Sequence, residues 1–394
     1  MEIPSERCTQ IYVRERFDKE MKNPEVRFSA VGDIALGDHP LCIGFGAHST
    51  FKDLPVTFPF QHVLDHLRKA DILFGNLECP LSEKALKRND YKSVQMRGKA
   101  EYVKGLVEAG FKVLNLANNH SMQHGRDVFL ETVSLLERHG IQYCGVNGES
   151  HSKTKPTIFE MNGMKLGFLG YSLRPRQYFT FDPLYSEGTL AGIDRDIDEV
   201  RHKVDTVIVS LHWGEEFIGY PAPEEIEMGR RIIEMGGDLI IGHHPHVLRR
   251  IERYRHGIIA YSLGNFVCDM IWDQRLRESL IFSCRITKQG IQDIELTPVY
   301  INDRYQPEIM DGRNGEILLS RIGSLSGGSF GEASISAEKG SHYLKSVREA
   351  QSLYRMKSRR FFIARLCKYP VPILAQIVLS FMKNRVKDFS KQTR

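Results

Sequence analysis

The chain has 394 residues and a net charge of +5, with 41% hydrophobic and 26% charged residues. This is an ordinary composition for a soluble globular protein, and the length suffices for one large domain or two small ones. The charge is uneven, because residues 341–394 contain 13 lysines and arginines against 2 acidic residues. This tail therefore carries +11 and the rest of the chain −6. An acidic body argues against a nucleic-acid-binding protein, so we expect no nucleic-acid partner.

The apolar and polar residues of the first part of the chain alternate between strand and helix patterns. Val26, Phe28 and Ala30 predict a first strand that ends at Asp33. Gly110 and Gly140 stand where the C-caps of two helices belong. Further strands are expected at residues 72–74, 113–117 and 141–145, helices at 63–67, 102–107 and 129–136, and a loop at 90–98.

The second part of the chain continues with strands, hairpins and one helix. Asn162–Gly163 between two apolar runs predicts a hairpin, and Gly290 lies at the turn of a second one. Buried strands are expected at residues 207–209, 239–241 and 258–261, and a helix at 228–235. Frequent Gly and Ser predict a loop at 311–341. We expect a main domain at 25–305, a linker or loop at 306–341 and a basic helical tail at 342–394.

Cysteine usage and the N-terminus bear on the cellular compartment. The seven cysteines are scattered without CxxC spacing, which predicts free thiols in a reducing compartment. Residues 1–23 are polar and lack the apolar core of a secretory signal. No apolar run reaches the roughly 18–20 residues of a membrane span. These features predict a cytoplasmic or peripheral membrane protein.

Three histidines follow the apolar run 239–241 within four residues. His244 and His246 are two positions apart, which would place their rings on the same side of an extended chain. Pro245 restricts the backbone between them. Neutral imidazole is the commonest transition-metal ligand, so this pair is a candidate metal site, although a surface histidine cluster without a role is the alternative.

Other predicted strands also end in polar side chains. Each has a structural explanation alone: Asp33 could be a turn residue and His212 a packed core histidine. Glu78 is harder to explain, because a carboxylate directly after a buried strand is costly unless it is paired or bound to a cation. Strand carboxyl ends converge at one edge of an α/β sheet, where sites form. The candidate set is Asp33, Asn76, Glu78, Asn118, Asn119, His120, His212, His244, His246 and Asn265.

Carboxylate, amide and imidazole ligands together suit a dinuclear site for two divalent metal ions such as Mn, Fe or Zn. Two cations about 3.5–4 Å apart can share a bridging carboxylate. Such a pair lowers the pKa of a bound water and stabilises an in-line displacement at phosphorus. A neighbouring histidine can protonate the leaving oxygen. The set therefore predicts a phosphoesterase-type hydrolase.

The same residues stand in motifs that resemble the bacterial CapA family of poly-gamma-glutamate capsule biosynthesis proteins. That family belongs to the calcineurin-like metallophosphoesterases. The resemblance runs from about residue 27 to 299 and rests on GD at 32–33, GNLE at 75–78, LANNH at 116–120, HWGEE at 212–216, GHHPHV at 242–247 and YSLGNF at 261–266.

The resemblance implies a four-layer α/β/β/α sandwich and a role for each motif residue. Asp33 and His246 would bind the first metal, and Glu78 would bridge to the second. Asn119, His212 and His244 would bind the second metal. His120 would be the acid beside the leaving group. Asn76, Asn118 and Asn265 would support these residues.

The chain departs from the wider superfamily or from its own family in three ways. Ala35 replaces the histidine that the wider superfamily carries two residues after the first aspartate, and CapA-like proteins usually lack it too, so we expect one metal to be held weakly. Gln123 replaces an aspartate three residues after His120, and we expect it to orient that ring. Members in Gram-positive capsule systems carry an N-terminal membrane anchor, which is not found here.

Two functions remain open at this point, as does the role of the tail. The protein is either a metal-dependent hydrolase or a non-catalytic metal-binding component of a polymer synthesis or export complex, with membrane proteins as partners. In the tail, the apolar residues 371–382 lie between cationic flanks, which is typical of an interfacial helix on an anionic membrane surface. Alternatively, Ile373, Ile377 and Phe381 cap the body of the protein.

Overall fold

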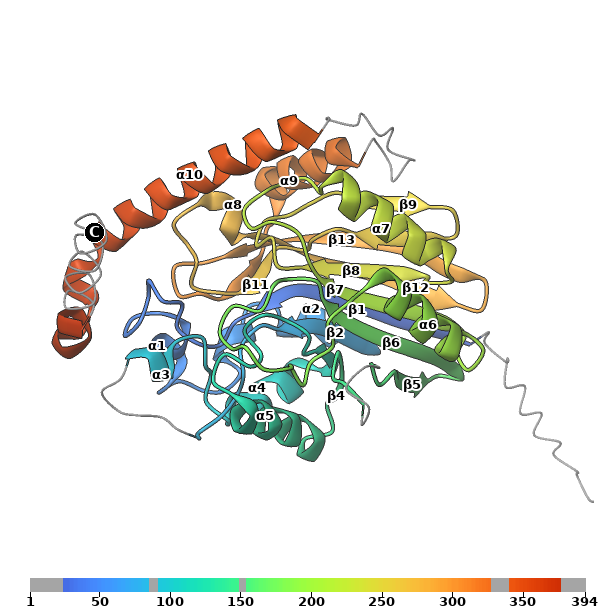
Figure 1. Ribbon diagram of the computed structural model, residues 1–394, viewed down its shortest axis with the longest axis horizontal. Coiled ribbons are helices and arrows are strands. Elements are labelled where there is room, and N and C mark those ends of the chain that lie inside the picture. Colours follow the sequence, from blue (N-terminus) through green and yellow to red (C-terminus); the bar gives the residue numbers. More distant parts are fainter. Residues whose placement is uncertain (1–23, 85–90, 149–153, 327–339, 377–394) are drawn as a thin grey trace, which may run out of the picture.

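Two β-sheets pack face to face and carry helices on their outer faces, which is the expected four-layer α/β/β/α sandwich (Figure 1). The computed structural model describes residues 24–84, 91–148, 154–326 and 340–376. Apolar side chains from both sheets share one buried cluster, so the layers form a common core.

The first sheet has the strand order β14-β13-β12-β1-β2-β3-β4, and β11 pairs with β1 as well. Strands β1 to β4 run parallel, whereas β12, β13 and β14 add antiparallel neighbours. The strands are β1 (Glu25–Ile34), β2 (Ile72–Leu77), β3 (Phe111–Asn115), β4 (Gln142–Cys144), β11 (Asn265–Val267), β12 (Glu278–Thr287), β13 (Gly290–Ile301) and β14 (Pro307–Ile309).

The second sheet has the order β5-β6-β7-β8-β10-β9. Its central strands β6, β7, β8 and β10 are parallel, and an antiparallel strand closes each edge. The strands are β5 (Thr157–Met161), β6 (Met164–Ser172), β7 (Thr206–His212), β8 (Leu239–His243), β9 (Ile251–Tyr254) and β10 (Gly257–Ala260). Both predicted hairpins are confirmed, at Asn162–Gly163 between β5 and β6 and at Gly290 between β12 and β13.

The inter-sheet core is apolar and partly aromatic. Phe28 and Phe74 of the first sheet meet Phe168 of the second, and the rings of Phe74 and Phe168 stack with centroids 5.9 Å apart. The alternation that predicted β1 points Val26, Phe28 and Ala30 into this layer, since alternate residues of a strand share one face.

Amphipathic helices cover the outer faces. Helices α4 (Tyr102–Ala109) and α5 (Arg126–Arg138) bury apolar side chains against the first sheet. Helices α6 (Leu190–Arg201) and α7 (Pro223–Glu234) do the same on the second sheet. Shorter helices lie in the connections: α1 (Ala47–Phe51), η1 (Phe58–Phe60), α2 (Leu64–Leu67), α3 (Tyr91–Val94), α8 (Gln274–Arg277) and η2 (Leu366–Lys368).

Two segments that were expected to be loops contain helices. The short α3 lies within 90–98, and α9 (Gly312–Leu325) occupies much of 311–341. The loop prediction was wrong for α9 because burial outweighs the poor helix propensity of its glycines. Its residues Leu318 and Ile322, one helical turn apart, insert into the inter-sheet core.

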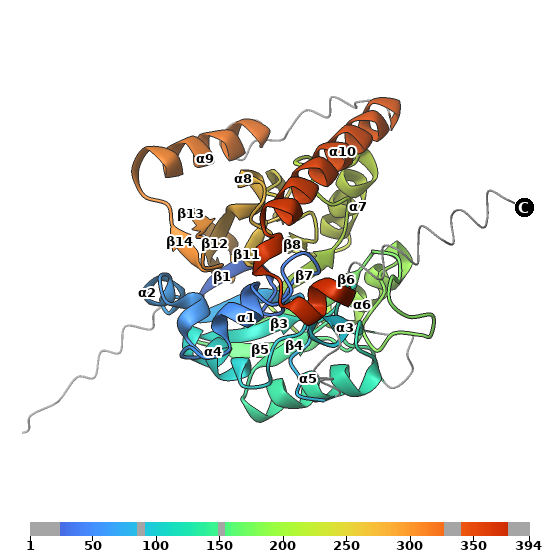
Figure 2. The same ribbon diagram turned by 90° about the vertical axis from the view of Figure 1, so that its left-hand side faces the viewer.

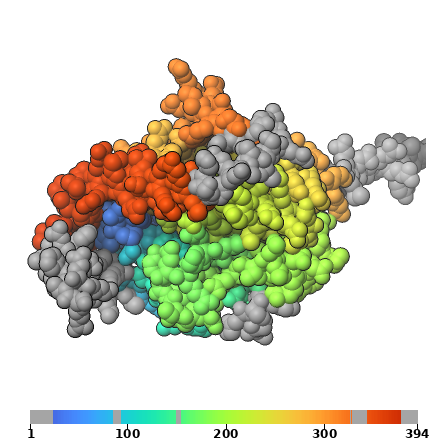
Figure 3. Space-filling model, turned by 45° about the horizontal axis from the view of Figure 1, so that its top comes forward, coloured from blue at the N-terminus to red at the C-terminus, as the bar shows by residue number. Residues whose placement is uncertain are grey.

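The tail begins with the expected helix, α10 (Gly340–Ala364), which lies along the body of the molecule (Figures 2 and 3). One face is buried through Tyr343, Val347 and Phe361, so this part of the tail caps the body. The outer face exposes Leu353 and Ile363 among arginines. Ile377, Phe381 and the second half of the apolar stretch 371–382 lie outside the described residues.

The described cysteines are free thiols. Five are buried, and Cys367 is exposed. Burial raises the pKa of the Cys79 thiol to about 12, so this group stays protonated. Across the described ranges, no helix is both long and apolar enough to cross a membrane.

Candidate metal centre

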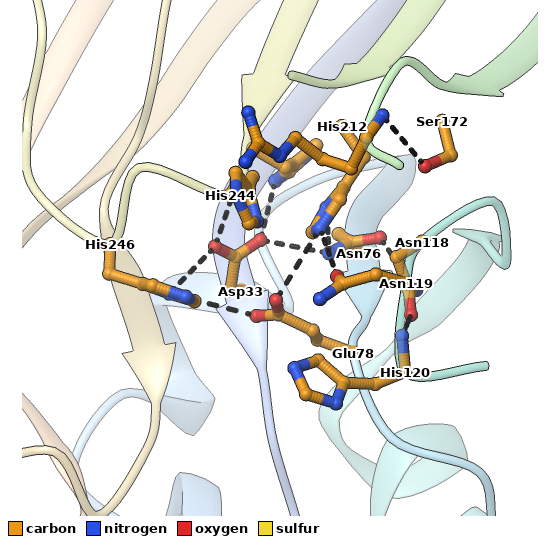
Figure 4. Close-up of polar contacts among 12 residues, drawn as sticks. Asp33, Asn76, Glu78, Asn118, Asn119, His120, Ser172, His212, His244 and His246 are labelled. Atoms are coloured by element: carbon orange, nitrogen blue, oxygen red, sulfur yellow. Dashed lines mark hydrogen bonds and ion pairs between the residues drawn. The ribbon is translucent and has the colours of Figure 1, made fainter. Parts of the chain in front are cut away.

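Most of the predicted residues gather at the carboxyl ends of strands from both sheets (Figure 4). Asp33 lies in β1, Asn76 and Glu78 at the end of β2, and His212 at the end of β7. The remaining candidates follow β3 and β8 or begin β11. The candidate ligands Asp33, Glu78, Asn119, His212, His244 and His246 are all buried.

Glu78 occupies the centre of this group. Its Oε1 atom lies 3.5 Å from Nε2 of His212, and its Oε2 atom lies 3.8 Å from Nδ1 of His246. The same nitrogen of His246 lies 3.5 Å from Oδ2 of Asp33. Glu78, His244 and His246 offer ligand atoms that all lie within 4.8 Å of one another. The carboxylate of Glu78 therefore stands between two sets of candidate ligands.

On one side of Glu78, the second set is formed by His212, Asn119 and His244. Oδ1 of Asn119 lies 2.8 Å from Nε2 of His212, so the two ligand atoms point toward each other. The rings of His212 and His244 have centroids 4.7 Å apart. Asn119 also donates to Oε1 of Gln177 at 3.0 Å, which fixes the orientation of its amide.

The first set of candidate ligands consists of Asp33 and His246, and a network of asparagines holds Asp33. Asn76 donates to Oδ1 of Asp33 at 2.8 Å and accepts from Asn115 at 3.0 Å. Asn118 donates to the carbonyl of Leu77 at 2.8 Å, which ties the loop after β3 to β2. Because these amides are buried and bonded, they hold Asp33 in place.

Asn265 has the same supporting position on the other side of the site. Its Oδ1 lies 2.9 Å from Nδ1 of His246, and its amide nitrogen donates to the carbonyl of Leu276 at 2.9 Å. The ring of His246 is therefore held from the first sheet, although His246 follows a strand of the second.

The backbone around His244 and His246 differs from the prediction. Strand β8 continues through Gly242 to His243, and the two ligand candidates have positive φ angles of 94° and 58°. The rings meet Glu78 through left-handed turns on both sides of Pro245 rather than through an extended chain. Non-glycine residues rarely adopt such angles, and strain of this kind is concentrated at functional sites.

His120 lies beside this group and outside the two ligand sets. Its Nδ1 atom lies 2.7 Å from Oε1 of Gln123, which is the expected orienting contact. Its ring packs against Tyr178 with centroids 5.3 Å apart. Burial lowers the pKa of His120 to about 4, and the hydrogen bond to Gln123 opposes this shift.

Buried ligand atoms without hydrogen-bond partners indicate that this donor set fits divalent cations. Oε1 of Glu78 and both ring nitrogens of His244 are buried without a hydrogen-bond partner among the described residues. Buried polar atoms are normally bonded, so an unsatisfied carboxylate oxygen and imidazole in one cluster fit the ligands of a divalent cation. Ala35 offers no ligand and packs in an apolar cluster with Met96 and Phe217, so the first set has one candidate fewer.

The pKa shifts of the candidate ligands also bear on cation binding. Burial raises the pKa of Glu78 well above its ordinary value, and the carboxylate of Asp33 raises it further. Burial lowers the pKa of His212 and His244 well below the usual range. Desolvation thus disfavours the carboxylate of Glu78 and the imidazolium forms of His212 and His244. His246 differs, because desolvation is outweighed by the carboxylates of Glu78 and Asp33, which raise its pKa to about 10. A bound cation would stabilise the carboxylates and would require neutral imidazoles.

The structure adds site residues that the sequence did not single out. His243 is fully buried, and its Nδ1 lies 3.1 Å from Oδ1 of Asp33. Glu216 lies 4.0 Å from His244, and Tyr178 and Tyr354 line the same pocket. His243 lies within the GHHPHV motif and Glu216 within the HWGEE motif, so the sequence offered a signal that both residues belong to the site. Tyr354 lies more than a hundred residues downstream, and nothing in the sequence connects it to the site.

Comparison with known proteins decides the family. Residues 27–270 match the model of the family described as bacterial capsule synthesis protein PGA_cap. The chain belongs to this family. It is 30% identical over 295 residues to the capsule biosynthesis protein CapA of Bacillus anthracis, with 72% of this chain and 70% of that protein covered. It is 32% identical over 284 residues to the PGA biosynthesis protein CapA of Bacillus subtilis, with coverage of 70% and 71%.

The resemblance to CapA proteins drawn from the motifs is therefore confirmed. Among solved structures, a putative 5'-nucleotidase of Staphylococcus aureus aligns with a TM-score of 0.44 and 14% identity, over 76% of this chain and 58% of that one. The region matched by the PGA_cap model contains every candidate ligand and ends before α9 and α10. The helices α9 and α10 are therefore features of this chain that the family match does not describe.

Proposed function

We propose that the protein is a metal-dependent phosphoester hydrolase with a dinuclear site, acting in the biosynthesis of a capsule polymer. The position of Glu78 carries this proposal. Its two carboxylate oxygens face His212 and His246, which belong to different ligand sets. A carboxylate in this position can bridge two cations.

The residues divide between the two metals as follows. Asp33 and His246 would hold one ion, while Asn119, His212 and His244 would hold the other, with Glu78 shared. Bound divalent ions supply Lewis-acid charge that stabilises the oxygens of an in-line phosphoryl displacement. The polar residues behind them, above all Asn76 and Asn265, fix ligand orientation, which contributes strongly to metal affinity.

The residues that line the pocket at the site suggest that an anion would bind there only together with metal ions. It is lined by Glu78 and Glu216 together with His39, His120 and His246, and none of the described residues that line it is a lysine or arginine. Without bound cations, the acidic side chains of this pocket offer a phosphoryl group no compensating positive charge. Phosphate affinity should therefore depend on bound cations, whose charge exceeds that of the two carboxylates.

His120 is placed to protonate the leaving oxygen, a role that requires its ring to take up a proton against the effect of burial. It lines the pocket next to Glu78, and Gln123 and Tyr178 fix its ring. It lies directly after Asn119, but no candidate ligand is among its hydrogen-bond partners in the described part of the chain. A positioned acid of this kind typically contributes about 10²–10⁴ in rate.

The polymer context comes from the relatives, which are named for capsule and PGA biosynthesis. A second candidate function is a non-catalytic component of a polymer synthesis or export complex that keeps one metal for structural reasons. Ala35 favours this alternative, because it removes a ligand from the first metal. The number of bound metals and the hydrolytic rate distinguish the two.

The test is metal analysis together with hydrolysis of p-nitrophenyl phosphate and bis-p-nitrophenyl phosphate. Protein from cells grown with manganese, iron and zinc should contain close to two ions per chain. Glu78→Gln preserves the shape of the side chain and should lower both metal content and hydrolysis. The exposed Glu101→Gln serves as the matched control. A wild-type protein without bound metal would refute the dinuclear site, and one stable ion without hydrolysis would favour the structural role.

A further inference from the structure

Helix α10 crosses the mouth of the metal pocket. At one end Tyr343 and Val347 pack against Ile218 and Ala222, in the loop after β7. Beyond its other end, the hydroxyl of Tyr369 donates to the carbonyl of Leu41 at 2.6 Å. The helix thus spans two loops on either side of the site. Figure 3 shows it as a red band against the body, next to the blue N-terminal segment.

Between these anchors, Tyr354 reaches into the site. Its ring stacks on Phe217 with centroids 3.4 Å apart and an interplanar angle of 8°. Phe217 in turn stacks on His246 at 6.0 Å, so an aromatic column leads from α10 to a candidate metal ligand. Trp272 packs edge-on against Tyr354, and Lys357, less than one turn further along, pairs with Asp273 at 3.0 Å. These contacts hold Tyr354 in a fixed position.

The pocket that results is small. Its volume is about 100 Å³, against the roughly 300–1,000 Å³ of sites that enclose a drug-sized ligand. Tyr354 and Phe217 form the wall beside His246, and Tyr178 forms the wall beside His120. This volume suits a group of phosphoryl size, and the aromatic walls leave little room for bulky substituents on two sides of it.

We propose that Tyr354 is a specificity-determining residue that restricts the site to phosphoryl groups at the end of a substrate, that is, to phosphomonoesters. This inference rests on the proposed phosphoester hydrolase function. The physical basis is steric: an ester with one substituent extends that substituent out of the pocket, whereas a second aryl or sugar substituent meets the aromatic wall. Tyr354 lies outside residues 27–270, the region matched by the family model, whereas Phe217 lies within it.

The test measures binding and turnover in the full-length, manganese-loaded protein. Calorimetry with phenyl phosphate and diphenyl phosphate gives the binding preference, and the two p-nitrophenyl substrates give the ratio of kcat/KM. Tyr354→Ala should increase diphenyl phosphate affinity and diester kcat/KM at least about tenfold, with little change for the monoesters. Tyr354→Phe keeps the ring and should behave as wild type. Leu353→Ala, at the neighbouring exposed position, is the surface control.

A variant that removes the ring but fills part of its volume, Tyr354→Leu, guards against loss of folding in Tyr354→Ala. Its preference should fall between those of the alanine variant and the wild type. Folded Tyr354→Ala or Tyr354→Leu that binds phenyl phosphate and keeps the wild-type preference for monoesters would overturn the role of Tyr354. That result would leave the proposed hydrolase function standing. Failure of the metal-loaded wild type to bind phenyl phosphate or to hydrolyse either substrate would overturn the proposed function and this inference with it.

Discussion

The ring of His120 is held by Gln123, whose Oε1 atom lies 2.7 Å from Nδ1 of the histidine. A side-chain amide oxygen can only accept, so Nδ1 carries the proton in this contact. In the proposed reaction, the other ring nitrogen, Nε2, would then exchange a proton with the substrate. Since an amide supplies no negative charge, Gln123 sets the direction of the ring and stabilises an imidazolium less than an aspartate would.

We expect Gln123→Leu to lower turnover of substrates with poor leaving groups by about tenfold or more, because the ring loses its orientation and proton transfer becomes less efficient. Phenyl phosphate tests a poor leaving group and p-nitrophenyl phosphate a good one. Metal content should stay unchanged, since Gln123 is not a candidate ligand. His120→Asn should show the same selectivity with a larger loss. Equal losses on both substrates would contradict acid catalysis by His120.

Asp269, a buried carboxyl group outside the candidate ligands, should contribute to the pH dependence of stability. Asp269 is fully buried; its Oδ2 atom accepts from the backbone of His39 and Ala47, and its Oδ1 atom has no partner among the described residues. Burial raises its pKa to about 8, and the neighbouring Asp38 adds to this shift. Other ionisable groups that interact with it include Cys42, Cys268, Tyr305 and Tyr369.

The sign of the effect follows from proton uptake. Asp269 binds a proton in the folded state up to about pH 8, but in the unfolded chain only below its ordinary value near 4. Stability should therefore fall as pH rises through this window, by at most about 1.4 kcal/mol for each pH unit. Asp269→Asn cannot titrate, so the variant should lose less stability between pH 5 and pH 8 than wild type. Thermal unfolding with chelator present measures this, and parallel curves for both proteins would contradict it.

The sequence predicted most of the sheet strands because their buried runs are continuous and their turns carry Asn–Gly or Gly signals. It predicted the gathering of the site residues because parallel strands end at one edge. It did not reveal α9, where the burial of Leu318 and Ile322 outweighs three glycines. The wall built by Tyr354 was also hidden, since it depends on a contact between segments more than a hundred residues apart.

Gly242 illustrates a position where the fold requires the absence of a side chain. A Cβ atom there would overlap the carbonyl of Tyr261 and press on the indole of Trp213. We expect Gly242→Ala to shift the end of β8, lower the melting temperature and reduce metal content, because His244 and His246 follow directly. Gly229→Ala on α7 is the matched control: its Cβ would make ordinary contacts, and alanine favours the helix. Normal metal content and stability in Gly242→Ala would show that the turn after β8 tolerates the shift.

The outer face of α10 combines the features of a membrane-docking surface. It exposes Leu353, Met356 and Ile363 next to the exposed Arg359 and Arg360. Apolar side chains flanked by cations suit the interface of an anionic bilayer. The opposite face of the helix packs on the body, so docking would leave the fold unchanged.

We therefore predict that the full-length protein sediments with vesicles that contain phosphatidylserine, and less so as salt increases. Each cation near an anionic surface contributes about 1 kcal/mol. Reversing two charges in the double variant Arg359→Glu, Arg360→Glu should consequently weaken binding at least about tenfold, while the melting temperature changes little. Arg126→Glu with Arg138→Glu on α5 changes net charge equally on another exposed surface and should bind as wild type does. Equal weakening by both pairs would mean that net charge alone governs binding. No sedimentation by the wild type at low salt would show that α10 only caps the body.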